Sequence, residues 1–444
     1  MTQEENPQGQ ASPNNAQASE ATPAPDMKTV ADFLKLMYLA RDHRRAIVLS
    51  MLVKDSPKAA TEQGQLGELF ARLDAATKAP NKVSLELGED KQIAMDVKDE
   101  LLELKKDLAF LAAEGGGSFR EVLSLCPGLS ADALEGEAEE VASMLRPAIP
   151  NLVLITDWDG TMKDYGSNYS SCIQPAYSAV ILCRFAAACT RFACVLTAGP
   201  LRQPGILDLT AVPVARGYVA YGGCWGREWL LNDQRYVQDS HISTQARAAL
   251  QLFTSRMESL LAKNFPMFRY IGSGFQVKVD RITFGIQNVS NCVQPDETEQ
   301  LVAAIKSVLA EIDPTSTIFH IDRAKYDLEV ILNEATQGVW DKGAGVGYLE
   351  ELEPPGLDLT GDALVLVCGD TASDLPMVRC LLARNLRNVR AVFVATTDAV
   401  KTELAKMFEH NPKAYICVSC PQVIHCAMVK LLNEASPKAK AGSA

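Results

Sequence analysis

Two aspartates one residue apart follow directly on an apolar run, in the segment NLVLITDWDGTMKDY at residues 151–165. Asp157 and Asp159 carry like charges, so their closeness needs an explanation. One explanation is structural, a strand edge followed by a polar turn. The other is catalytic: one carboxylate attacks, the other handles a proton, and a bound cation makes their proximity tolerable.

Three further stretches bear on this choice: LTAG with Thr197, WDKGAG with Lys342, and GDTASD with Asp370 and Asp374. Each is a weak signal alone, because short polar motifs are common in turns. Asp157, Thr197 and Asp370, however, stand at or near the ends of apolar runs that are typical of parallel strands. Active sites of parallel sheets lie beyond the carboxyl ends of the strands. Together the four stretches favour catalysis.

These residue types suit hydrolysis of a phosphate monoester, which is a dianion and repels nucleophiles. Mg²⁺ held by carboxylates offsets that repulsion and lets Asp157 attack phosphorus. The resulting aspartyl-phosphate splits one difficult hydrolysis into two steps. Asp159 lies on the same side of the extended backbone, where it can protonate the leaving oxygen and then take a proton from water.

The other motif residues complete this site. Thr197 and Lys342 are expected to bind the phosphoryl oxygens. Asp370 completes the metal site. Asp374 either ligates the metal, directly or through water, or orients Lys342. Thr161 is expected to hydrogen-bond within the loop that shapes the substrate site.

The site residues need a scaffold, and the second half of the chain provides its pattern. Continuous apolar runs alternate with helical patterns at 175–189 and 374–384, which predicts a parallel sheet covered on both faces. The runs are NLVLITD (151–157), FACVLTAG (192–199), ALVLVCGD (363–370), VRAVFVA (389–395) and AYICVS (414–419).

An α+β insertion interrupts this pattern. Residues 274–289 alternate apolar and polar side chains, as half-buried antiparallel strands do. A helical stretch at 297–311 follows, and then STIFHID and YDLEVILN read as two more strands. We expect the insertion to cover the site as a cap that excludes water and recognises the substrate.

The N-terminal part has a helical pattern. Phe33, Leu36, Met37 and Ala40 recur at helical spacing, and a second stripe predicts one helix face: Ile93, Val97, Leu101, Leu104, Leu108 and Leu111. No convincing strand is evident. Such a bundle either packs against itself and the rest of the chain, or serves self-association or partner docking.

The expected division of the chain follows from these patterns. It comprises a disordered tail (1–26), a helical bundle (27–113), a linker with a short helix (114–149), the first part of the phosphatase core (150–225), the cap (226–337), the second part of the core (338–435) and a flexible tail (436–444).

Residues 150–435 resemble the haloacid-dehalogenase-type phosphatases, and more closely the trehalose-6-phosphate phosphatases, in particular the longer roundworm-type members. The resemblance rests on DWDGTMKDY, VLTAGPLR, PGILDLTA, WGREW, KVDR, WDKG, GDTASDLPMVR and VSCPQVIHCAM. It implies a Rossmann-like parallel-sheet core with an inserted α+β cap and an N-terminal all-helical domain. It also implies Mg²⁺ as cofactor, trehalose 6-phosphate as substrate, and the backbone carbonyl of Asp159 as a metal ligand.

The resemblance also implies a set of cap residues that contact the disaccharide: Gln276, Lys278 and Glu329. Gln276 stands where shorter members have a glutamate, so it keeps hydrogen-bonding capacity without the charge. TAGP replaces the more usual arginine-containing loop after the threonine, and Arg202 is expected to compensate. WGREW at 225–229 either lines the site or forms a packed hinge.

Composition limits the classes of partner and the cellular location that we expect for the protein. The net charge of −12 and the lack of a long basic run argue against nucleic acid. No apolar run is long enough to span a bilayer, and no secretion signal is evident. Twelve scattered cysteines, several inside apolar runs, are typical of a reducing compartment, so we expect a cytoplasmic protein. A phosphatase for another sugar phosphate, such as sucrose 6-phosphate, and an inactive scaffold remain alternatives.

Overall fold

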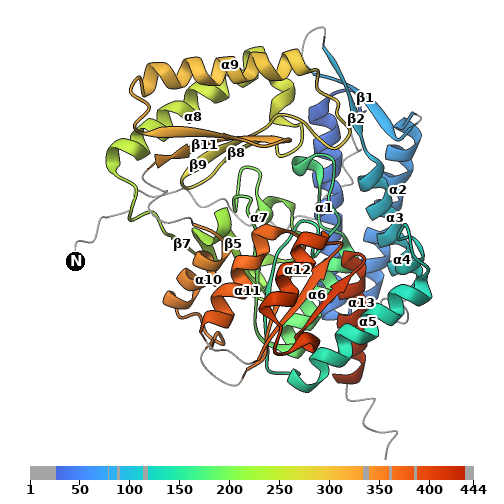
Figure 1. Ribbon diagram of the computed structural model, residues 1–444. Coiled ribbons are helices and arrows are strands. Elements are labelled where there is room, and N and C mark those ends of the chain that lie inside the picture. Colours follow the sequence, from blue (N-terminus) through green and yellow to red (C-terminus); the bar gives the residue numbers. More distant parts are fainter. Residues whose placement is uncertain are drawn as a thin grey trace, which may run out of the picture.

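The computed structural model describes residues 27–78, 80–87, 91–113, 119–333, 340–359, 363–384 and 388–435. The expected tails at 1–26 and 436–444, and the expected boundary at 337/338, lie outside these residues. Three parts are visible in Figure 1: a core that holds most of the sheet strands, a cap above it, and N-terminal elements along one side of both.

The core sheet has eight strands in the order β14-β13-β12-β3-β4-β5-β6-β7. The strands from β14 to β5 run parallel, which confirms the predicted parallel sheet, and β6 and β7 add an antiparallel edge. The strands are β3 (Leu152–Thr156), β4 (Thr190–Leu196), β5 (Ala220–Gly223), β6 (Glu228–Leu231), β7 (Gln234–Val237), β12 (Val365–Gly369), β13 (Val389–Val394) and β14 (Tyr415–Val418).

Helices cover both faces of this sheet, because its central strands are apolar on both sides. On β3, Leu152 and Leu154 pack with one helical layer, whereas Val153 and Ile155 pack with the other. The first layer contains α4 (Arg120–Ser124), α5 (Ala131–Leu145), α6 (Ala176–Cys189) and α13 (Pro421–Ala435), and the second α10 (Lys342–Glu351), α11 (Leu375–Ala383) and α12 (Asp398–Met407). The one-turn helix α7 (Ile206–Leu209) follows the Thr197 loop.

The cap is a four-stranded antiparallel sheet in the order β10-β11-β9-β8. Its strands are β8 (Phe275–Val277), β9 (Arg281–Gly285), β10 (Phe319–Arg323) and β11 (Asp327–Leu332). The helices α8 (Thr244–Asn264) and α9 (Pro295–Ile312) lie on the side of this sheet away from the core (Figure 1). The cap begins later than the expected residue 226, because β6 and β7 pair with the core sheet.

The N-terminal part is helical, but a hairpin interrupts it. The helices α1 (Val30–Val53), α2 (Ser56–Ala76) and α3 (Lys98–Ala112) are joined by β1 (Lys82–Glu86) and β2 (Gln92–Asp96). The expectation of a bundle without strands was therefore wrong at Lys82–Glu86 and Gln92–Asp96. Ile93 lies on β2, and Val97 is the N-cap residue of α3. The apolar stripe was misread as one helix because a spacing of four residues fits both the strand period and the helix period.

The N-terminal helices pack on the core as well as on each other. Arg44 on α1 forms a fully buried ion pair with Asp107 on α3 at 2.6 Å, and Asp107 also accepts from the backbone N–H of Tyr177 on α6 at 3.2 Å. Of the two interpretations left open, packing against the rest of the chain is thus observed. Among the described residues, no helix is long and apolar enough to span a membrane.

Candidate active site

Three carboxylates meet at the carboxyl ends of the adjacent parallel strands β3 and β12. One oxygen from each of Asp157, Asp370 and Asp374 lies within 4.8 Å of the others. Asp157 follows β3, and its backbone N–H donates to the carbonyl of Cys368 on β12 at 2.9 Å. Gly160, at φ 80°, permits this approach, because a Cβ there would lie 2.4 Å from Asp370 Oδ2.

Lys342, the first residue of α10, lies inside this cluster and is 2% exposed. Its Nζ donates to Asp157 Oδ1 and, at 2.5 Å, to Asp374 Oδ1. Burial alone would lower the pKa of Lys342, but the two carboxylates raise it above its usual value. Lys342 therefore stays charged and neutralises part of the site.

The carboxylates respond to burial and to each other. Burial and the charge of Asp374 raise the pKa of Asp157 to about 7, against the opposing effect of Lys342. Burial and the two neighbouring carboxylates raise the pKa of Asp370 to about 8. Burial acts to raise the pKa of Asp374, but Lys342 and two backbone N–H groups, each at 3.0 Å, hold it below its usual range.

This donor set fits a divalent metal ion. Carboxylate oxygens are hard ligands, and three of them brought this close are stabilised by added positive charge. The Asp159 carboxylate is not part of the group; its Oδ1 accepts from Lys163 Nζ at 2.5 Å. The expected contribution of Asp159 to the metal, through its backbone carbonyl, does not depend on that side chain.

The two threonines have different positions. Thr197 follows β4, is 3% exposed and lines the cavity described below. Thr161 is fully buried and donates its hydroxyl proton to Asp157 Oδ2 at 3.1 Å. Thr161 thus orients Asp157 from within the loop and does not line that cavity.

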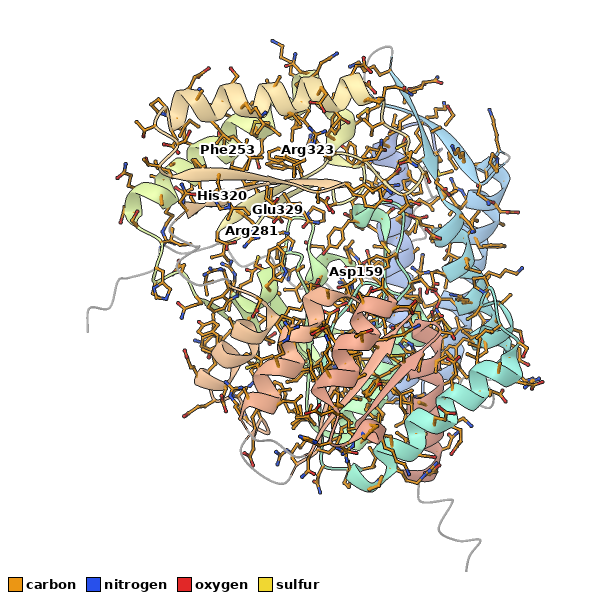
Figure 2. The ribbon with its side chains drawn as sticks, viewed as in Figure 1. Asp159, Phe253, Arg281, His320, Arg323 and Glu329 are labelled. Atoms are coloured by element: carbon orange, nitrogen blue, oxygen red, sulfur yellow. The ribbon has the colours of Figure 1, made fainter. Side chains whose placement is uncertain are left out.

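A cavity of about 350 Å³ lies between the core and the cap. Asp157, Asp159, Thr197, Lys342 and Asp370 form its core side. Figure 2 shows Asp159 on the core, with Arg281 and Glu329 on the cap strands above it. The cavity therefore joins a carboxylate-rich floor to a polar roof.

The predicted cap residues Gln276, Lys278 and Glu329 all line this cavity. Gln276 on β8 and Glu329 on β11 both lie opposite Thr283 on β9, so the three form a row across the sheet. Glu329 accepts from Thr283 at 2.8 Å, Lys278 at 3.4 Å and Arg281 at 3.0 Å. Burial opposes ionisation, but the two cations keep the pKa of Glu329 below its usual range.

The WGREW segment both lines the site and packs. Trp225 lines the cavity, and the cationic groups of Lys278 and Arg281 each lie 4.3 Å from the centre of its ring. Arg227, by contrast, forms a buried ion pair with Asp280 at 3.0 Å. These contacts hold the cap strands against the end of β5.

Arg202 is not brought to the site. Its side chain is 61% exposed and pairs with Asp208 at 2.9 Å, and it does not line the cavity. The expectation that Arg202 compensates for the TAGP loop therefore has no support in the geometry. The Asp208 carboxylate holds Arg202 at the one-turn helix that follows the loop.

Several residues on the segment after the two aspartates contact the site, although they were not predicted from the sequence. Lys163 binds Asp159, Tyr165 donates to Asp370 Oδ2 at 2.8 Å, and Tyr169 lines the cavity wall. The spacing of four between Asp159 and Lys163 was a usable signal for an ion pair. Nothing in the sequence indicates that the two tyrosines fold back over the site.

Comparison with known proteins gives matches over most of the chain. The family model described as trehalose-6-phosphate phosphatase, C-terminal, matches residues 154–424. The model described as trehalose-6-phosphate phosphatase N-terminal helical bundle domain matches residues 29–121.

Individual relatives agree with these models. A trehalose-phosphatase of Brugia malayi is 36% identical over 436 residues, which cover 92% of this chain and 87% of that protein. A trehalose-phosphatase of Caenorhabditis elegans is 33% identical over 432 residues, covering 92% of this chain and 97% of that protein. A solved trehalose-6-phosphate phosphatase of Aspergillus fumigatus is 16% identical, with a TM-score of 0.38, over 67% of this chain and 97% of that one.

Proposed function

The chain belongs to the trehalose-6-phosphate phosphatase family, and from this premise we propose that it hydrolyses trehalose 6-phosphate to trehalose and inorganic phosphate. One observation supports this most directly. Asp157, Thr197, Lys342 and Asp370 come from separate strand ends or helix starts, yet they line one cavity. The roof of that cavity is a row of polar cap side chains that suits a sugar.

In the proposed reaction, Asp157 attacks phosphorus and an aspartyl-phosphate forms on its carboxylate. Thr161 and Lys342 hold the two oxygens of Asp157, so the attacking oxygen has a fixed direction. Lys342 and Thr197 then donate to the phosphoryl oxygens, where negative charge develops.

Asp159 serves as the acid and base of this mechanism. It gives a proton to the sugar oxygen as the ester bond breaks, and it takes a proton from the water that attacks the aspartyl-phosphate. Lys163, 1% exposed, fixes the position of Asp159 through its 2.5 Å hydrogen bond. The pair keeps the carboxyl group near the leaving oxygen through both steps.

The metal of the proposed site is Mg²⁺, held by Asp157, Asp370 and the backbone carbonyl of Asp159, with Asp374 as a direct or water-mediated ligand. When bound, the ion supplies the positive charge that offsets repulsion between the phosphate dianion and the Asp157 carboxylate. Lys342, which donates to Asp157 and Asp374, would add a second positive charge beside the phosphoryl group.

The cap residues give the proposed specificity. Gln276, Thr283 and Glu329 present amide, hydroxyl and carboxylate groups in one row, and Lys278 adds a cation beside them. Sugar hydroxyls both donate and accept, so a row of this composition suits a disaccharide. Another sugar phosphate remains the second candidate, because the same groups bind hydroxyls of many sugars.

Two further expectations remain predictions. All twelve cysteines are free thiols, which supports the expected cytoplasmic location. Self-association or partner docking through the N-terminal helices stays a prediction, since the described contacts of these helices are with one another and with the rest of the chain.

The decisive experiment measures phosphate release from a panel of sugar phosphates, with Mg²⁺ and with a chelator. We expect preferential hydrolysis of trehalose 6-phosphate, loss on chelation, and loss of turnover in Asp157→Asn. Preference for another sugar phosphate would contradict the roles proposed for the cap residues but would agree with the chemistry proposed for the core residues. Release from none of the sugars would favour the inactive-scaffold interpretation, and unchanged turnover in Asp157→Asn would exclude that residue as nucleophile.

A further inference from the structure

Tyr169 carries a polar group that none of the proposed steps uses. It begins a short turn, Tyr169–Ser171, and lines the cavity between core and cap. Its hydroxyl is buried and has no hydrogen-bond partner among the described residues. A buried hydroxyl without a partner is unfavourable, so its retention beside a ligand cavity points to a partner that arrives with the substrate.

The loop after Thr197 is shaped to admit this hydroxyl. A Cβ on Gly199 would lie 2.7 Å from the Tyr169 oxygen, 3.2 Å from Tyr169 Cζ and 3.7 Å from Thr197 Oγ1. The tyrosine oxygen thus rests against Gly199, where any larger residue would displace it. The hydroxyl is placed beside the TAGP loop, within reach of the substrate that Thr197 faces.

The cap and the N-terminal part both fix the backbone around Tyr169. Its N–H donates to the carbonyl of Gly272 in the cap at 2.8 Å. The preceding Asn168 accepts from the N–H of Gly272 at 3.3 Å and from the Asn288 amide at 3.4 Å. Ser171 donates to Glu100 of the N-terminal helix α3 at 2.6 Å. A side chain held this way is pre-organised, so little entropy is lost when it binds a ligand.

The electrostatic surroundings keep the hydroxyl protonated. Burial, and then the negative charge of Asp159, raise the pKa of Tyr169 well above its usual value. The hydroxyl therefore has a proton to donate at any physiological pH. Tyr169 and Asp159, the proposed acid for the leaving oxygen, both line the same cavity.

We propose that the Tyr169 hydroxyl donates a hydrogen bond to an oxygen of the sugar unit that carries the phosphate, and so determines specificity for a sugar over a simple aryl phosphate. The inference rests on the proposed phosphatase function. Tyr169 belongs to the core segment that follows the two aspartates, whereas the other proposed sugar contacts come from the cap.

The test compares wild type and Tyr169→Phe on trehalose 6-phosphate and on p-nitrophenyl phosphate, which has no sugar hydroxyls. The ratio of the two kcat/KM values measures sugar recognition apart from phosphoryl chemistry. We expect this ratio to fall about tenfold in Tyr169→Phe, as loss of one hydrogen bond to a substrate predicts. The Tm should stay the same or rise, because the substitution removes an unpartnered polar group.

Tyr177→Phe is the matched control. The Tyr177 hydroxyl is also buried, but it donates to Glu103 at 3.0 Å and accepts from Gln422 at 2.9 Å, away from the cavity. This variant should lower the Tm and leave the substrate ratio unchanged. The two substitutions delete the same atom, so their opposite patterns separate substrate binding from structural support.

A double-mutant cycle with Gly199→Ala tests the geometry. The added methyl group should displace the hydroxyl and lower the ratio much as Tyr169→Phe does. Combining both changes should lower it no further than either one alone, because they remove the same contact. Fully additive losses would contradict the contact between Tyr169 and Gly199.

Two outcomes would overturn the inference: a ratio in Tyr169→Phe within twofold of wild type, or equal losses on both substrates, which would assign the hydroxyl to the phosphoryl group. If the proposed function is wrong, the wild-type enzyme itself will prefer another sugar phosphate, and this result is distinct from a failure of the Tyr169 inference. The ratio of kcat/KM on that sugar phosphate to kcat/KM on p-nitrophenyl phosphate would then test the role of Tyr169.

Discussion

Replacing Lys106 by methionine should destabilise the protein, because Lys106 fastens the N-terminal helix α3 to the catalytic loop. Its Nζ is fully buried and donates to Glu103 at 2.8 Å and to Asp164 at 2.5 Å. Asp164 lies next to Lys163, which in turn holds Asp159. The lysine thus connects the N-terminal part to the segment that carries the proposed acid.

The size of the effect follows from the charges left behind. Removing one partner of a buried ion pair destabilises by about 3–5 kcal/mol, because the other charge stays uncompensated. Burial raises the pKa of Glu103 to about 8, so it is largely protonated at pH 6 and places little charge in the cavity left by the lysine. At pH 6 we therefore expect a loss of about 3 kcal/mol, mainly from Asp164.

The loss should grow as the pH rises. A folded-state pKa above the unfolded value means that the protonated carboxyl group stabilises the fold at low pH, and that this contribution is lost as the pH rises from the unfolded value to about 8 in wild type. Lys106 lowers the pKa of Glu103, so the pKa rises further in Lys106→Met, and above about pH 8 the variant continues to lose stability where wild type does not. At pH 9 we expect a loss near the upper limit of about 5 kcal/mol.

Calorimetric Tm values at pH 6 and pH 9 measure this. An unfolding entropy of about 2.1 cal/mol/K per residue gives a fall of about 1 °C per kcal/mol for a chain of this length, so we expect falls of about 3 and 5 °C. Lys105→Met is the control, because Lys105 is exposed on the same helix and should shift the Tm by less than about 1 °C.

A second variant tests the cause. Adding Glu103→Gln to Lys106→Met removes the carboxyl group that must ionise, so the extra loss at pH 9 should disappear. Equal Tm values for the Lys105 and Lys106 variants at both pH values would refute the reasoning. So would a loss at pH 9 that is no larger than the loss at pH 6, because Glu103 would then not gain charge over this pH range.

Three other predictions concern the site and the core. Lys163→Met should lower kcat on trehalose 6-phosphate about tenfold or more, and lower it less on p-nitrophenyl phosphate, whose leaving group needs little protonation; equal losses would place Lys163 outside the proton transfer. Asp370→Asn should raise the Mg²⁺ concentration needed for half-maximal activity at least about tenfold, since one carboxylate ligand is lost. It should also raise the Tm of the metal-free protein, because it removes repulsion between neighbouring carboxylates. A lowered Tm of the metal-free variant would contradict that repulsion. Burial lowers the pKa of His425 to about 4, so its stabilising effect is complete above about pH 6.5 and lost as the pH falls toward 4, at about 1.4 kcal/mol per pH unit. The difference in unfolding free energy between wild type and His425→Gln, measured in urea from pH 7 to 4.5, should show that slope; a constant difference would contradict it.

Much of the core could be predicted from sequence, because a strand buried on both faces must be apolar throughout. The end of such a strand is also where polar residues of a parallel-sheet site gather, so Asp157, Thr197 and Asp370 were predictable. The antiparallel edge was missed, although Asn232 and Asp233 form a two-residue turn at φ 47° and 64° between the short strands β6 and β7. That dipeptide was a usable hairpin signal.

Other features depend on contacts that a local pattern does not contain. The N-terminal hairpin shares its apolar spacing with a helix, and only the pairing of β1 with β2 selects the strand. Thr283 joins Gln276 and Glu329 through the register of three strands, which sequence does not give. Tyr169 reaches Gly199 across the fold, so neither residue alone indicates the contact.

The segment from Lys163 to Ile173 is where the parts of the molecule act on one another. Lys163 binds Asp159, the proposed acid and base, and Tyr165 binds Asp370, a proposed metal ligand. The α3 helix reaches the same segment at Asp164 and at Ser171, and the cap reaches it at Asn168 and Tyr169. The N-terminal part therefore influences the geometry of Asp159 without touching the substrate, through the residues that support its loop. A loss of α3 contacts should consequently affect proton transfer to the leaving sugar before it affects metal binding. The proposed proton donor Asp159 is held by Lys163 of this segment, whereas the proposed metal carboxylates follow β3 and β12 or precede α11, and of these Asp370 contacts the segment, through Tyr165.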